Sequence, residues 1–133
     1  MLTIREEQLK ALGDGGRAEF AREMAPRLRG FFPGALDGCS EELLLEKIGE
    51  ALDRAADLEL ERRMDVAHYL NLCVAAGWKL EGNPKFVEIW RALEPRAGVT
   101  AGERVAEACG RMQQWLELQY ARAEAMAWLR KEK

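Results

Sequence analysis

The fold is decided by residues 64–77, which read MDVAHYLNLCVAAG. A helix built from this stretch has apolar side chains on almost every side, which is typical of a helix that its neighbours bury. The polar residues Asp65, His68 and Asn71 fall three apart, so they share one narrow stripe of that helix. We therefore expect a central helix over about residues 61–76, covered by other helices on most of its surface.

Further helices are predicted on both sides from cap residues and from apolar residues at helical spacing. The expected helices are residues 4–31, 41–56, 84–93 and 101–130, capped by Thr3, Ser40, Asn83 and Thr100 in that order. Gly13, Gly15 and Gly16 lie inside the first of these. Each glycine in a helix costs about 1 kcal/mol relative to alanine. We expect a break or a weak point there.

The buried faces follow from the same spacing. We expect helix 41–56 to bury Leu44, Ile48, Ala51, Leu52 and Ala55, and the turn at Phe31-Phe32-Pro33 to hold its loop against the core. The stripe of the last helix comprises Val105, Cys109, Met112, Leu116, Ala123 and Met126 or Ala127. The stripe thins beyond Tyr120, so we expect the last three turns to project or to dock on a partner.

Composition supports one all-α domain over residues 1–133. The chain is long enough to bury a core without disulfides or metals. Hydrophobic residues make up 48% of it and charged residues 32%. These proportions suit a helical globule. The expected architecture is a single-domain bundle of about five helices around the central helix, ending in a long C-terminal helix.

Charge and cysteine content argue against several classes of function. Residues 1–66 carry a net charge of about −5 and residues 67–133 about +2. Neither half provides the concentrated basic face that nucleic acids require. Cys39, Cys73 and Cys109 are odd in number and widely spaced, which indicates neither a disulfide framework nor a zinc site. We expect no metal, no cofactor and no nucleic acid.

The N-terminal residues MLTIREEQ carry charge where a signal peptide would be apolar. No stretch approaches the roughly 20 apolar residues that a bilayer span requires. The sequence therefore predicts a cytoplasmic protein that does not enter the membrane.

One constellation could support catalysis. Asp65 and His68 lie three apart on the central helix, so the carboxylate could orient the imidazole for general base chemistry beside Tyr69. No nucleophile, glycine-rich loop or second carboxylate accompanies them, and His68 is the only histidine. The simpler interpretation is an acidic residue near a helix N-terminus and a histidine on the open stripe, which predicts no enzyme.

Tryptophan is unusually frequent in this sequence, which contains Trp78, Trp90, Trp115 and Trp128. Trp and Arg are enriched at the centres of protein interfaces. Core packing accounts for Trp90 and Trp78, but Trp115 and Trp128 stand at the edge of the last helix's stripe. The predicted partner-binding residues are Trp115, Tyr120, Arg122 and Trp128.

Several segments resemble a family of small bacterial proteins encoded among type VI secretion genes. The resemblance starts with LTIREEQ at residues 2–8, RAEF at 17–20 and LRGFFP at 28–33. The family then has a stretch of the form RAxxYGI followed by DVxxYxxLxxxxG, and residues 54–56 and 65–77 are similar to it. The likeness covers about residues 2–93 and implies a helper in a toxin-delivery locus, without an activity to transfer.

Taken together, the sequence predicts a non-enzymatic protein-binding accessory, an adaptor or chaperone, of a type VI secretion effector or spike component. Two alternatives stay open: an immunity protein that neutralises a cognate toxin, and a helical homo-oligomer. Homodimerisation could use the stripe of the last helix.

Overall fold

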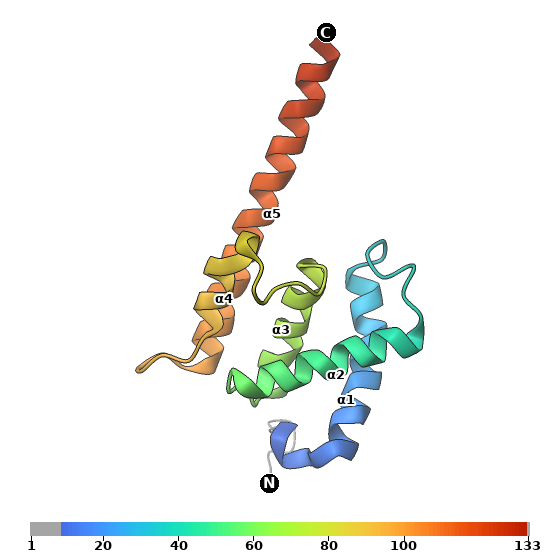
Figure 1. Cartoon of the computed structure of the whole chain (residues 1–133), viewed down its shortest axis with the longest axis vertical. Coiled ribbons are helices and arrows are strands. Elements are labelled where there is room, and N and C mark those ends of the chain that lie inside the picture. The colour runs from blue at the N-terminus through green and yellow to red at the C-terminus, as the bar shows by residue number, and fades with distance from the viewer. Residues whose placement is uncertain (1–8, 133) are drawn as a thin grey trace.

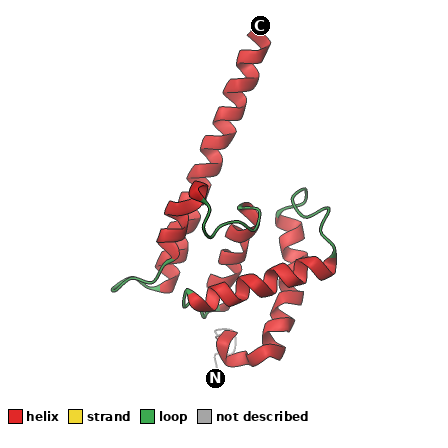
Figure 2. Cartoon of the chain, in the orientation of Figure 1, coloured by secondary structure: helices red, strands yellow, loops and turns green. Residues whose placement is uncertain are grey.

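A computed structural model describes the backbone of residues 9–132 and the side chains of residues 15–131. Over these residues the chain is helical and contains no strand (Figure 2). The elements are α1 (Leu9–Phe31), α2 (Glu41–Asp57), α3 (Arg63–Ala75), the 3-10 turn η2 (Pro84–Phe86), α4 (Val87–Leu93) and α5 (Ala101–Glu132). The predicted all-α bundle with a long C-terminal helix is confirmed.

Helix α3 occupies the centre of the bundle, as predicted. Figure 1 shows it between α1 on one side and the α4–α5 pair on the other, and it contacts α1, α2 and α5. Val66 and Leu70 are fully buried, whereas His68 is exposed and Asp65 and Asn71 are half-buried. The apolar residues of this one helix thus join the halves of the core.

The predicted N-terminal caps of three elements are confirmed. The Ser40 hydroxyl accepts from the Leu43 amide at 3.1 Å, and the Asn83 side chain accepts from the Lys85 amide at 3.0 Å. At α5 the Thr100 amide donates to the Glu103 carboxylate at 2.8 Å, and the Glu103 amide donates to the Thr100 hydroxyl at 3.1 Å. These two bonds complete a capping box. Local spacing therefore fixes where these helices begin.

Helices α2 and α3 end in the same way, with a left-handed residue just past the helix. The Leu60 amide donates to the Ala55 carbonyl at 2.9 Å, and the Trp78 amide donates to the Cys73 carbonyl at 2.7 Å. Gly77 holds the left-handed position after α3, as predicted, with φ of 65°. After α2 that position falls to Glu59 with φ of 61°. A residue with a side chain is strained in this conformation.

The first helix is not broken at its glycines. Helix α1 runs through residues 13–16 without interruption, although Figure 1 shows its dark-blue first turns at an angle to the rest. Pro26 lies inside α1 on its exposed side, and it lacks the amide proton that would otherwise donate to the Arg22 carbonyl. The predicted start at Ile4 behind Thr3 and Glu6 lies outside the described residues.

The turn after α1 is held by an arginine as well as by an aromatic side chain. Phe32 packs on the core, but Phe31 is 66% exposed, so the predicted role holds for only one of the pair. Arg29 donates to the carbonyl of Leu36 at 3.0 Å and to that of Cys39 at 2.8 Å. These hydrogen bonds fix the loop that leads to α2.

Arg104 joins three helices at the base of α5. It is 3% exposed, and its Nη1 donates to the carbonyl of Leu58 at 2.8 Å and to the carbonyl of Leu93. Those carbonyls lie at the C-terminal ends of α2 and α4, where helix dipoles place partial negative charge. Arg104 pairs with no carboxylate among the described side chains. Two helix ends therefore balance this buried cation and tie α5 to the bundle.

Candidate protein interface

Helix α5 consists of a packed half and an exposed half. Val105, Ala108 and Met112 are buried against the bundle, and the half-buried Trp115 meets the edge of Phe86, with ring centroids 4.9 Å apart at 63°. From Leu116 to Lys131 every side chain is exposed except that of Gln119, which is half-buried. Figure 1 shows this part of α5 extending away from the other helices. We call residues 116–131 the projecting segment.

The projecting segment concentrates exposed apolar surface. Six of the ten exposed large hydrophobic residues among the described side chains lie on it, at exposed fractions of 44 to 68%. They are Leu116, Leu118, Tyr120, Met126, Trp128 and Leu129. Single exposed hydrophobic residues are common on proteins, but this concentration on one element makes the projecting segment the candidate interaction surface.

The stripe predicted for the last helix is buried only over its first half. Val105 and Met112 are buried, but Leu116, Ala123 and Met126 are exposed. The physical reason is that α4 is only seven residues long, and η2 and α4 cover α5 no further than Trp115. The expectation that the last turns project is therefore met one turn earlier than predicted.

The four predicted partner-binding residues occupy different environments. Tyr120 and Trp128 are 68% and 61% exposed, and Arg122 is exposed on the same segment. Trp115 instead packs on Phe86, at the point where α5 leaves the bundle. At about 100° per residue, Arg122 lies about 120° or more around the helix from both Tyr120 and Trp128. The three exposed residues therefore do not share one face.

Charged residues of the projecting segment differ from those of the bundle. In the bundle, arginines pair with carboxylates, as in Arg17 with Asp53 at 2.9 Å and Arg111 with Glu107 at 3.2 Å. In the projecting segment, the charged side chains that form no ion pair with any described side chain are Arg122, Arg130, Lys131, Glu117 and Glu124. No opposite charge lies three or four positions from any of these five within residues 116–131.

The proposed Asp65, His68 and Tyr69 constellation is not assembled. Tyr69 is 1% exposed and hydrogen-bonds to the Cys73 thiol on the core side of α3, whereas His68 is exposed. Burial raises the pKa of Tyr69 above its ordinary value and raises the pKa of Cys73 to about 12. The phenol and the thiol are therefore neutral packing groups at physiological pH.

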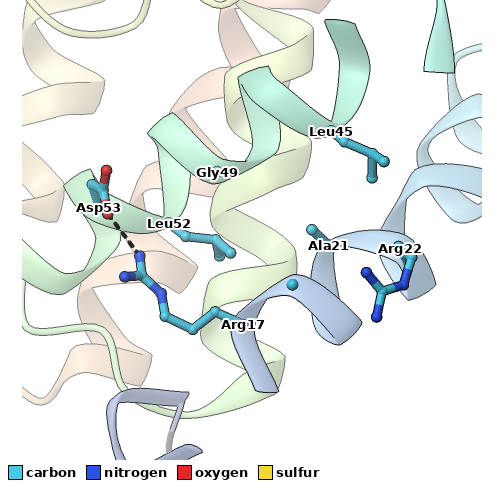
Figure 3. A pocket seen from close by; sticks show the side chains of 8 residues that line it. Arg17, Ala21, Arg22, Leu45, Gly49, Leu52 and Asp53 are labelled. Atoms are coloured by element: carbon cyan, nitrogen blue, oxygen red, sulfur yellow. Dashed lines mark hydrogen bonds and ion pairs between the residues drawn. The ribbon is translucent and has the colours of Figure 1, made fainter. Parts of the chain in front are cut away.

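A shallow groove lies between α1 and α2. Its volume is about 390 Å³, and small residues, including Ala21 and Gly49, leave the space open (Figure 3). Arg17 and Asp53 pair across one end, and Arg22 lies at the other. The described residues that line the groove include no histidine, cysteine or hydroxyl, and its charged groups are Arg17, Arg22 and Asp53.

Other classes of site find no support in the described part of the chain. Residues 9–132 contain no group of three potential metal ligands, and none of their helices combines the length and apolarity of a membrane span. The chain matches no protein-family model, curated protein or solved structure in the comparisons made with each. The exposed half of α5 is therefore the candidate functional site among the described residues.

Proposed function

We propose that this protein acts by binding another protein through the projecting segment, and that it has no enzymatic activity of its own. The observation that carries this proposal is a run of 16 helical residues, exposed at every position but one and rich in large apolar side chains. A helix of this length spans about 24 Å and is marginal in water unless an amphipathic face is packed.

The charge pattern supports the same conclusion. Helices that stand alone in solvent are stabilised by many ion pairs three or four residues apart. The projecting segment has none between the described side chains of residues 116 and 131, although it carries both signs of charge. Its stability must therefore come from burial of its apolar side chains, which the described part of this chain does not provide.

The cellular context of the proposal rests on the resemblance of residues 2–93 to small proteins encoded among type VI secretion genes. In that context the partner is an effector or spike component, and this chain is its adaptor or chaperone. The bundle is the scaffold, and the exposed half of α5 is the recognition element.

The test is affinity capture of the tagged full chain from cells that carry the gene, with spike and toxin proteins quantified against an untagged control. A Leu116→Ala, Met126→Ala variant, which shortens two exposed apolar side chains of the segment, should lose the captured partner. A matched Phe31→Ala, Met64→Ala variant should retain it, because those side chains are also exposed, at 66% and 71%, but lie outside the segment. Equal loss in both variants, or no partner in any of them, would contradict the proposal.

A further inference from the structure

The two arginines of the projecting segment lie on a different side of the helix from its two carboxylates. At about 100° per residue, Arg122 and Arg130 lie about 80° from each other, on the side that also carries Met126. Glu117 and Glu124 lie about 120° or more from both arginines, and Lys131 lies within about 40° of both carboxylates. One face therefore carries Met126 and two arginines without a carboxylate, whereas the carboxylates share another face with Lys131.

The cationic face continues the packed face of the bundle. Along α5, residues at spacings of three and four lead from the buried Val105, Ala108 and Met112 to Gln119, Arg122, Ala123, Met126 and Arg130. We call this second group the seam face. In the bundle the same line is covered by η2 and α4, so a partner on the seam face would extend an interface that already exists.

We propose that the partner of the projecting segment is a protein with an apolar groove flanked by carboxylates, which receives the seam face with Met126 as its central apolar contact. This inference rests on the proposed function and adds the chemistry of the partner. Arg122 and Arg130 are eight residues apart, so the partner places its acidic groups about 12 Å apart along the groove. Guanidinium groups suit such sites because each can bind a carboxylate through two hydrogen bonds.

The same arrangement argues against two other occupants. A second copy paired through the seam face would bring arginines against arginines, and like charges in a buried contact cost several kcal/mol. An anionic membrane surface requires one apolar face opposite one polar face. Trp128 and Met126 lie about 160° apart around the helix, so the apolar side chains are not confined to one side.

The test is photo-cross-linking of the full chain in cells that carry the gene, with a benzophenone side chain in place of either Met126 or Ala121. Met126 lies on the seam face, and Ala121 lies about 140° away from it around the helix. We expect a protein adduct from position 126 that is at least tenfold stronger than from position 121. Sequencing of the cross-linked peptide should place Asp or Glu residues beside the contact.

Charge reversal then tests the chemistry. Arg122→Glu with Arg130→Glu should weaken the adduct at position 126 by about tenfold or more, the scale expected when a desolvated charge pair is lost. Glu117→Lys with Glu124→Lys changes as much charge on another face and should leave the adduct unchanged. Reversal of the partner's carboxylates to lysine should restore the adduct of the first variant.

Each other outcome overturns a defined part of the reasoning. Adducts from position 121 alone, or adducts insensitive to charge reversal, would refute the seam face while leaving the proposed binding function intact. An adduct of twice the chain mass would assign the surface to a second copy, and a lipid adduct would assign it to a membrane. No adduct from either position would refute the proposed function together with this inference.

Discussion

Replacement of the buried Arg104 by methionine should destabilise the protein by about 2 kcal/mol. Methionine keeps most of the apolar stem but removes the donors to the Leu58 and Leu93 carbonyls, which belong to residues 5% and 0% exposed. Each buried carbonyl left without a partner costs about 1–3 kcal/mol. The substitution also removes the Arg104 Nε, which is buried without a hydrogen-bond partner among the described residues. Removal of this unpaired donor stabilises the variant by about 1–3 kcal/mol, which offsets the loss at one of the two carbonyls. The net destabilisation therefore equals the cost of the other carbonyl.

The chain provides a matched control at the same helix end. Arg96 also donates to C-terminal carbonyls of α4, to Arg91 at 2.9 Å and to Ala92 at 3.2 Å, but its side chain is 38% exposed. Water can replace its hydrogen bonds, and its ion pair with Glu107 is partly screened. Arg96→Met should therefore cost at most about 1 kcal/mol.

Urea unfolding at pH 7, followed by far-ultraviolet circular dichroism, measures both free energies of unfolding. Cations buried without a carboxylate partner can also be net liabilities, because desolvation of the charge costs several kcal/mol. Unchanged or increased stability of the Arg104→Met variant would show that the two helix ends do not balance the guanidinium, and would refute the reasoning.

Backbone strain and pKa support three further predictions. Glu59→Gly should raise the free energy of unfolding by about 0.5–1 kcal/mol, because glycine relieves the left-handed position; equal stability in urea would contradict this. At pH 8, mass spectrometry should find Cys39 alkylated by iodoacetamide well before Cys73, whose pKa of about 12 leaves almost no thiolate. The hydrogen bond from the Thr100 amide lowers the pKa of Glu103 below 4.5, so its contribution to stability is present above pH 4.5 and is lost as the pH falls further. The stability advantage of the natural chain over Glu103→Gln should therefore shrink from pH 6 to pH 3.

The parts of the fold that depend on near neighbours in sequence could be predicted. Ser40 and Thr100 cap helices through contacts three residues away, and all five residues expected on the buried face of α2 are buried. Gly77 takes the left-handed position after α3, and Trp78 next to it also has φ of 65°. Each of these features is set by about one helical turn of sequence.

The features that sequence did not reveal depend on distant residues. Arg104 reads as an ordinary polar position beside Val105, and its partner Leu58 is 46 residues away. Arg63 follows another arginine, so in the sequence it looks like an ordinary solvated cation. In the structure it forms an ion pair with Glu23, and its Cζ lies 4.8 Å from the centroid of the Phe20 ring. Such contacts require knowledge of which helices lie side by side.

The sequence also could not show which part of the last helix is covered by other helices. A helical stripe has the same period whether a neighbouring helix covers it or not, so Met112 and Met126 look alike in sequence. The length of α4 separates them, because cover ends near Trp115. One signal in the sequence could have identified the exposed half of α5. Oppositely charged residues three or four positions apart stop after Arg111, although charged residues continue to the end of the helix. The loss of local charge pairing beside persistent apolar residues distinguishes the exposed half of α5 from its packed half.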